Sequence, residues 1–191
     1  MNVAIFPLNA VLFPDGMLRL RIFEQRYLEM TKRCLRDETP FGVCLIKEGT
    51  EVGAPAVPHH VGCLAAITEW DMPQLGVFTL VARGGARFRI VDHSVDRLGL
   101  ITAEIETWDA DPPGAEMVPA CRKLVETLIE RTGGEIFSEP ARVDDAVWVS
   151  YRLAEILPLA HQARQELLEL RDAGERLRRI AKVLAEEGYT G

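Results

Sequence analysis

The chain has 191 residues, of which 48% are hydrophobic and 27% are charged, as is usual for a folded globular protein. A chain of this length forms one large domain or two small ones, and folding buries roughly 70% of its unfolded surface. The formal net charge is −7 and neither half, divided after Gly114, is basic. This argues against a general nucleic-acid or anionic-membrane surface, because such surfaces concentrate Lys and Arg.

Strand-like patterns fill the chain up to about residue 108. Residues 17–22 alternate apolar and charged side chains, as in a strand with one buried face. Gly84-Gly85 supplies the positive-φ freedom of a tight hairpin between two such segments. Short strands at this spacing favour a small barrel or sandwich. The segments with strand-like patterns are 17–22, 41–46, 61–70, 76–83, 86–91 and 100–108.

One helix interrupts these strands. Tyr27, Met30 and Cys34 recur at helical spacing, and Pro40 closes the region. Glu24 lies near the expected N-terminus of this helix, where a carboxylate suits the helix dipole.

Residues 109–116, DADPPGAE, crowd Asp, Pro and Gly together, and the apolar period then changes from two to 3.6. We therefore expect a β-rich part over residues 1–110 and a helical part over residues 115–191.

Residues typical of helix starts and stops divide the second part into four expected helices. Gly133-Gly134 ends the first apolar stripe, and residues 138–140 have the types that begin the next helix. Asp172 with Glu175 gives a capping-box-like start to the last helix, and Gly188 is a suitable stop. The expected helices lie within residues 117–132, 138–158, 161–170 and 172–188.

No sequence pattern indicates catalysis. GxxxxGK[ST], GxGxxG and GxSxG are all absent. Asp92-His93-Ser94 has the residue types of a triad, but neighbours on a strand point to opposite faces. His59-His60 with Cys63 has metal-ligand types but no evident fourth ligand, so a polar loop is the preferred interpretation. Glu104 and Glu106 share a strand face that we interpret as solvated. We predict no catalytic residue, cofactor or metal.

The four cysteines, Cys34, Cys44, Cys63 and Cys121, form no CxxC pair, so neither a zinc ribbon nor a redox dithiol is indicated. The N-terminal MNVAIFPLNAVLFP carries two prolines and no basic residue, unlike a signal peptide or a membrane span. We expect a cytoplasmic protein with reduced thiols and no membrane attachment.

Residues 6–27, FPLNAVLFPDGMLRLRIFEQRY, resemble the opening of the Lon protease N-terminal domain family, also called the Lon substrate-binding domain. That family begins with "PL", "VLFPG" and "L.LRIFEPRY". Here Asp15 precedes the glycine and Gln25 replaces the usual proline. The resemblance continues over about residues 4–187, through FGVCLI, VGCLAAI, GGARFRI and ARQELLELRDAGERLRRIAKVL.

The resemblance implies an α+β fold, with a PUA-like β pseudo-barrel containing one inserted helix and then a C-terminal helical bundle. In Lon proteases this domain precedes an ATPase module and a Ser–Lys peptidase module, and neither fits this sequence. The resemblance therefore implies a stand-alone, non-catalytic module that binds polypeptide or a partner protein, as a substrate receptor or adaptor related to Lon-type proteolysis.

Arg21, Glu24, Arg26 and Tyr27 belong to the family signature, and we interpret them as structural. Arg21 on its strand, with Glu24 and Arg26 in the next turn, would form an ion-pair cluster that fixes the strand-to-helix angle. The binding surface would then be apolar and lie on the barrel face, on an unpaired edge strand or against the bundle.

Two alternatives stay open, together with the oligomeric state. A small-ligand protein or enzyme would show a deep polar pocket around His59, His60 or His93. An RNA-binding PUA-like protein is disfavoured by the acidic charge balance. It would require a basic stripe on one barrel face, formed by Arg19, Arg21, Arg83, Arg87 and Arg89.

Overall fold

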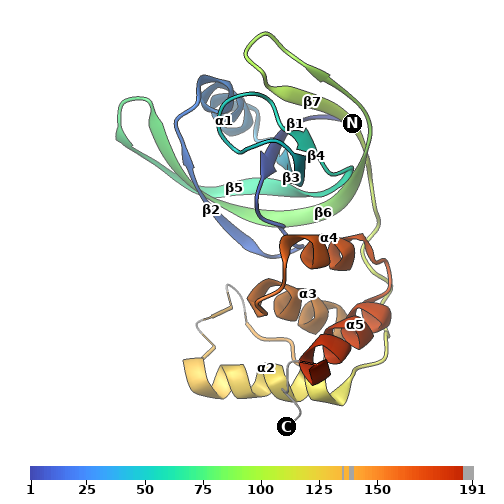
Figure 1. Ribbon diagram of the computed structural model, residues 1–191. Helices are drawn as coiled ribbons and strands as arrows, with labels where there is room; N and C mark the ends of the chain where they lie inside the picture. The colour runs from blue at the N-terminus through green and yellow to red at the C-terminus, as the bar shows by residue number, and fades with distance from the viewer. Residues whose placement is uncertain (135, 138–139, 187–191) are drawn as a thin grey trace. The chain divides into compact units, whose positions relative to one another are not determined.

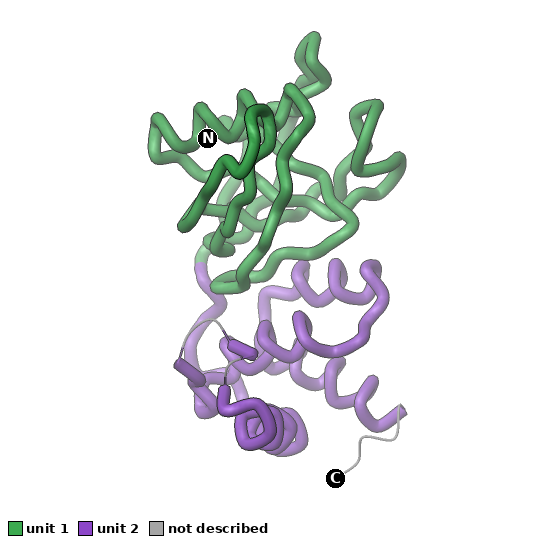
Figure 2. The backbone as a smooth tube through the Cα atoms, turned by 90° about the vertical axis from the view of Figure 1, so that its left-hand side faces the viewer, with its two compact units in different colours: residues 1–109 green, residues 110–191 purple. Residues whose placement is uncertain are grey.

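The computed structural model describes residues 1–134, 136–137 and 140–186. These residues form one seven-stranded sheet and five helices, which confirms the expected α+β class (Figure 1). The chain divides into two compact units, Met1–Asp109 and Ala110–Gly191 (Figure 2). None of the described helices is both long enough and apolar enough to cross a membrane.

Unit 1 holds the whole sheet, most of which is antiparallel. Strand β1 pairs with β7 on one side and with β3 on the other, so the pairings β1-β7-β6-β5-β3 return to β1 and form a closed ring (Figure 1). Among the described strands, β2 pairs with β6 alone. The elements are β1 (Asn2–Leu8), β2 (Met17–Ile22), α1 (Gln25–Asp37), β3 (Phe41–Glu48), β4 (Val57–Pro58), β5 (Val61–Gln74), β6 (Val77–Val95) and β7 (Ile101–Thr107).

Strand β6 runs unbroken from Val77 to Val95, so the hairpin expected at Gly84-Gly85 is wrong. Neither glycine has a positive φ. Glycine is required at position 84 for a different reason, because a Cβ there would collide with the carbonyl oxygen of Phe13. A pair of glycines is compatible with either use, and only the packing distinguishes them. The β5–β6 turn lies earlier in the chain, at Gly76, whose φ is +81°.

Helix α1 follows the expected pattern. Tyr27, Met30 and Cys34 are buried on one face, as their spacing predicts. Glu24 is the N-cap residue, although its side chain makes no capping hydrogen bond. The helix ends at Glu38, which adopts the left-handed conformation with φ +52°.

Unit 2 is helical, and two of its expected helix boundaries are met. Helix α2 ends at Gly133, whose φ is +66°. Helix α5 begins after Asp172, whose carboxylate accepts a hydrogen bond from the N–H of Glu175 at 2.6 Å. Gly188, the expected stop, lies outside the described residues. The helices are α2 (Pro119–Thr132), α3 (Ala146–Ile156), α4 (His161–Glu169) and α5 (Ala173–Glu186).

The start of α3 differs from the expectation at residues 138–140. Ser138 and Glu139 lie outside the described residues, and Pro140 precedes the helix. The helix begins at Ala146, because the Asp145 carboxylate accepts hydrogen bonds from the N–H groups of Val147 and Trp148 at 3.0 and 3.2 Å. A carboxylate that satisfies two free N–H groups defines a helix start better than a proline does.

A buried arginine organises the core of unit 2. Arg176 is 0% exposed and donates to Asp111 at 2.8 Å and to the hydroxyl of Ser150 at 2.8 Å. It also donates to the carbonyl oxygen of Leu170 at 2.6 Å, and its guanidinium lies 4.1 Å from the ring centre of Tyr151. The sequence places Arg176 in the "RL" of the last resembling segment, at helical spacing from Ala173 and Ile180, but it does not show which acceptors the buried guanidinium would meet.

Candidate functional site

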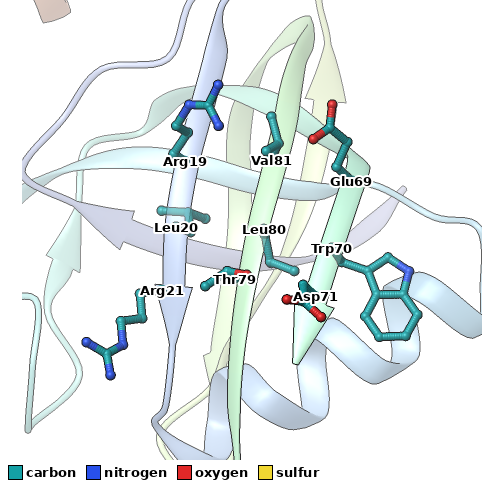
Figure 3. Close-up of a pocket in the computed structure, with 9 residues that line it drawn as sticks. All are labelled: Arg19, Leu20, Arg21, Glu69, Trp70, Asp71, Thr79, Leu80 and Val81. Atoms are coloured by element: carbon teal, nitrogen blue, oxygen red, sulfur yellow. The ribbon is translucent and has the colours of Figure 1, made fainter. Parts of the chain in front are cut away.

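The outer face of unit 1 is hollowed where β2, β6 and β5 lie side by side (Figure 3). We use "outer face" for the side of the sheet on which Thr79 is exposed, opposite the buried Phe78 and Leu80. The hollow has a volume of about 530 Å³. We term it the β2–β6–β5 groove, and it is lined by Arg19, Leu20, Arg21, Glu69, Trp70, Asp71, Thr79, Leu80 and Val81.

Charges are arranged across this groove in a regular way. The strand register forms two rows over the three strands, Arg19–Val81–Glu69 and Arg21–Thr79–Asp71. Each row begins with a cation on β2 and ends with a carboxylate on β5. The groove therefore has a basic side and an acidic side, separated by the small or apolar side chains of β6.

The two sides do not neutralise each other. Two strand spacings, about 10 Å, separate the backbone of β2 from that of β5. None of the four charged side chains forms an ion pair with any residue that the structure describes. In Figure 3 the guanidinium of Arg21 points away from β6 altogether. All four charges are exposed and open to a partner.

Three exposed apolar side chains lie on the last residues of β5 and in the β5–β6 turn, next to the groove. Trp70 is 55% exposed and Leu75 is 96% exposed, with Met72 between them in sequence and also exposed. Trp70 is opposite Leu80 in the strand register and its ring lies 5.8 Å from the ring of Phe78, so Trp70 is on the face of β5 opposite the outer face (Figure 3). We term Trp70, Met72 and Leu75 the hairpin patch. Exposed apolar side chains that are close neighbours in a chain mark interaction sites more often than isolated ones do.

The signature residues lie at or just after the Ile22 end of β2, which is also the end nearest the hairpin, and the structure brings three of them together. Arg26 is 4% exposed, donates to Glu24 at 3.0 Å and to the carbonyl oxygen of Gly99 at 3.2 Å, and lies 4.7 Å from the Tyr27 ring centre. Burial raises the pKa of Tyr27 to about 12, although nearby Arg26 acts in the opposite direction. Arg21 is exposed and stays outside this cluster.

The basic stripe that RNA binding would require does not form. Arg87 is buried, with its guanidinium 5.2 Å from the ring centre of Trp108. Arg83 and Arg89 each pair with a carboxylate, at 2.6 and 2.8 Å. The two remaining arginines of that set, both on β2, share their groove with the carboxylates of β5.

The histidines do not line either of the two pockets described here. His60 and His93 are exposed, and His93 lies on β6 with its triad-type neighbours. Cys63 is buried and donates its thiol to the carbonyl oxygen of Gly85 at 3.3 Å, whereas His60 is exposed. In the part of the chain that the structure describes, no three His, Cys, Asp or Glu residues cluster to hold a metal.

A second hollow, of about 400 Å³, lies within unit 2. Its polar side chains are engaged: Asp145 caps α3, and Asp144 pairs with Arg122 at 2.8 Å. Asp111 belongs to the buried cluster around Arg176. This hollow therefore offers fewer open charges than the β2–β6–β5 groove.

Sequence reasoning placed Arg19 and Arg21 on one strand face but missed Glu69, Asp71 and Trp70 as their neighbours. The signal for those neighbours is weak, because β5 pairs with β6 through bulges between Ile67 and Glu69 and between Asp71 and Gln74. Each bulge shifts the register, so alternation along the sequence does not show which residues share a row.

Comparison with known proteins gives a consistent result. Residues 2–186 match the model of the family described as the ATP-dependent protease La (LON) substrate-binding domain. Lon protease 1 of Bdellovibrio bacteriovorus is 25% identical over 88% of this chain and 22% of that protein. Lon protease of Koribacter versatilis is 28% identical over 94% of this chain and 23% of that protein. The chain thus spans about a quarter of the length of these curated relatives.

Solved structures agree with this match. The crystal structure of a Lon N-terminal domain protein from Xanthomonas campestris is 35% identical, with a TM-score of 0.77 over 95% of this chain and 98% of that one. The N-terminal domain of the Mycobacterium avium complex Lon protease has a TM-score of 0.66 over 95% of this chain and 97% of that one, at 16% identity, and shows the shared fold alone. The resemblance found in the sequence is therefore confirmed, and the chain belongs to the Lon substrate-binding domain family.

Proposed function

We propose that the chain is a non-catalytic module that binds polypeptide through the β2–β6–β5 groove and the hairpin patch, as a substrate receptor in Lon-type proteolysis. The observation that carries this proposal is the proximity along β5 of open charges of both signs, on the outer face, to exposed apolar side chains near the hairpin, of which Trp70 lies on the opposite face of the sheet. The family match supports the substrate class.

The physical reason is the composition of an unfolded chain. Such a chain exposes apolar side chains, charges of both signs and backbone groups that are free to pair. Trp70 and Leu75 offer apolar surface whose burial is worth about 25 cal/mol per Å². The charged rows add selectivity and steering, because each sign has a place on the groove.

Three further assignments belong to the same proposal. The closed ring of strand pairings in unit 1 supports a PUA-like pseudo-barrel, and the helices of unit 2 support a small helical bundle. The match to the substrate-binding domain supports a role without peptidase or ATPase chemistry, either as a receptor or as an adaptor. We place this role in the cytoplasm.

The test measures binding of the purified protein to a fluorescein-labelled polypeptide kept unfolded by reduction and alkylation of its disulfides. Fluorescence anisotropy is the readout, and the native form of the same polypeptide is the control. Selective binding of the unfolded form is expected. Equal binding of both forms, or binding of neither, contradicts the proposal.

A pair of variants assigns the surface. Trp70→Ser is expected to weaken binding about tenfold, because an exposed aromatic residue is the usual anchor of an interface. Leu98→Ser is the matched control, since Leu98 is equally exposed at 55% but lies in the β6–β7 turn. If both variants bind as well as the unmodified chain, the binding surface lies elsewhere.

A further inference from the structure

Strand β2 has one paired edge and one open edge. Met17–Ile22 pairs with Arg83–Phe78 of β6, and no other described strand pairs with β2. In Figure 3 β2 lies on one side of β6 and β5 lies on the other, and Arg21 projects from β2 away from β6. An open edge presents backbone N–H and C=O groups in a row, which is a template for another strand.

The hydrogen bonds at one end of β2 show which residues present those groups. Gly84 donates its N–H to the carbonyl oxygen of Gly16 at 2.8 Å and accepts from the N–H of Asp15 at 2.9 Å, so both its backbone groups point to the β2 side. This direction alternates along an antiparallel ladder. Leu18 and Leu20 therefore pair with β6, whereas Arg19 and Arg21 turn their N–H and C=O groups to the open edge.

The side chains alternate as well. Arg19 and Arg21 are exposed on the outer face, while Leu18 and Leu20 are half-buried on the opposite face and pack against the core of unit 1. An added strand would continue both patterns, because directly opposed residues of neighbouring strands share a face.

We propose that the open edge of β2 takes up an extended polypeptide segment as an added strand, and that the preferred segment alternates acidic and apolar residues. The acidic side chains lie opposite Arg19 and Arg21, and the apolar ones extend the surface of Leu18 and Leu20. This inference rests on the proposed function and specifies the class of segment that the chain recognises. It concerns backbone pairing beside the groove, in addition to the apolar contact with the hairpin patch.

Charge decides between this occupant and two others. A second copy of the chain, paired β2 to β2, would set the arginines of one copy against the arginines of the other, and opposed like charges destabilise a strand pair. A basic segment would meet the same repulsion. An acidic segment supplies the partners that Arg19 and Arg21 lack among the described residues.

Charged side chains on a strand edge also protect proteins from indiscriminate pairing. That protective effect and the proposed selectivity have one physical origin, since the two arginines disfavour neutral and basic strands and favour acidic ones. The distinction between protection alone and recognition is measurable, because protection alone predicts that no strand binds at all.

The first experiment uses fluorescein-labelled peptides and the unmodified chain. The probe is a short peptide of alternating valine and glutamate, compared with alternating valine and lysine and with a peptide that groups its valines and glutamates in blocks. Tighter binding of the alternating acidic peptide, by about tenfold over the other two, is expected. Equal binding of the three, or binding of none, overturns the inference.

Backbone N-methylation tests the pairing itself. Alternate residues of a strand direct their N–H groups to opposite edges. N-methyl groups placed on all valines or, in a second peptide, on all glutamates therefore block one edge each. Only one of the two peptides is expected to lose binding. Equal binding by both methylated peptides would falsify strand addition.

Protein variants test the two arginines. The double variant Arg19→Glu with Arg21→Glu is expected to lose about tenfold in affinity for the acidic peptide and to gain affinity for the basic one. Arg97→Glu is the matched control, because Arg97 is exposed elsewhere in unit 1, in the β6–β7 turn. A double variant that keeps its preference for the acidic peptide contradicts the inference.

Failure here is distinguishable from failure of the proposed function. If the unmodified chain binds unfolded polypeptide but none of the alternating peptides, the edge of β2 is not the site and the broader function stands. If it binds neither the unfolded polypeptide nor the peptides, both proposals fail together.

Discussion

The buried cluster of unit 2 and the β2–β6–β5 groove of unit 1 treat arginine in opposite ways. Arg176 is fully buried and donates to a carboxylate, a hydroxyl and backbone carbonyl oxygens. Arg19 and Arg21 are exposed and form no ion pair with any described residue. The guanidinium of Arg176 is therefore engaged within the fold, whereas the guanidinium donors of Arg19 and Arg21 are available to a ligand.

Desolvation explains this difference. Burying an unpaired charge costs several kcal/mol, so a buried arginine requires acceptors within the fold. An exposed arginine loses little without a partner, and so it can remain open until one binds. Burial thus separates arginines of the fold from arginines available for recognition. The signature around β2 contains both kinds, because Arg26 is buried and Arg21 is not. The structural interpretation of all four signature residues stays a prediction.

The largest effect is expected in the buried cluster. Arg176→Met leaves the Asp111 carboxylate buried without its main partner, and should lower the free energy of unfolding by about 3–5 kcal/mol. Urea denaturation followed by circular dichroism measures this loss. Arg178→Met on the same helix is the control and should change stability by less than about 1 kcal/mol, because Arg178 is exposed.

A second change in the same cluster checks the cause. Adding Asp111→Leu to Arg176→Met removes the unpaired carboxylate and should restore part of the lost stability, since an apolar replacement of a buried ion pair is often well tolerated. A double variant less stable than Arg176→Met alone would contradict the desolvation account.

The next effect on stability concerns Gly84, on the strand β6 that also lines the groove. Gly84→Ala places a Cβ against the carbonyl oxygen of Phe13 and should cost about 1–3 kcal/mol in unfolding free energy. Gly85→Ala is the adjacent control, because its Cβ would meet only ordinary contacts, at 3.6 Å from the carbonyl oxygen of Leu64. Urea denaturation of both variants compares them directly. Equal losses would show that close approach to Phe13 is not the reason for Gly84.

Much of the fold follows from local pattern. The alternation of residues 17–22 matches β2, and the helical spacing of Tyr27, Met30 and Cys34 matches the buried face of α1. Both patterns need only the period of the element and one buried face. The start of α3 and the role of Gly84 were wrong because each depends on a contact, a capping carboxylate in one case and a carbonyl oxygen from another segment in the other.

The groove was less predictable for the same reason. The sequence places Arg19 and Arg21 on one face, but their relation to Glu69 and Asp71 depends on strand register across two bulges. Arg176 lies at helical spacing from Ala173 and Ile180, on the apolar stripe of α5, but its partner Asp111 is 65 residues away in the chain, so the sequence does not show how its charge is satisfied. Long-range register and burial are properties of the packed chain.

The free energy of unfolding should fall at alkaline pH because of Tyr27 in the signature cluster. Burial raises the pKa of Tyr27 to about 12 from its ordinary value of 10.0. The unfolded chain therefore loses this proton first as the pH rises, so the contribution to stability is complete below pH 10 and is lost between about pH 10 and 12. Tyr27→Phe should have a shallower decline in unfolding free energy over this range, measured by urea denaturation at successive pH values. Parallel declines in the two proteins would show that Tyr27 is not the group responsible.

The smallest effect on stability is expected at the groove itself. Arg21→Ala removes an exposed charge that has no ion-pair partner among the described residues, so the unfolding free energy should change by less than about 0.5 kcal/mol. Arg26→Ala, a few residues away, removes buried charged hydrogen bonds to Glu24 and Gly99 and should cost about 1.5–3 kcal/mol. Thermal and urea denaturation of the two variants measure this difference. A loss at Arg21 as large as that at Arg26 would mean that Arg21 supports the fold, and the open charges of β2 would then lose their value as a guide to binding.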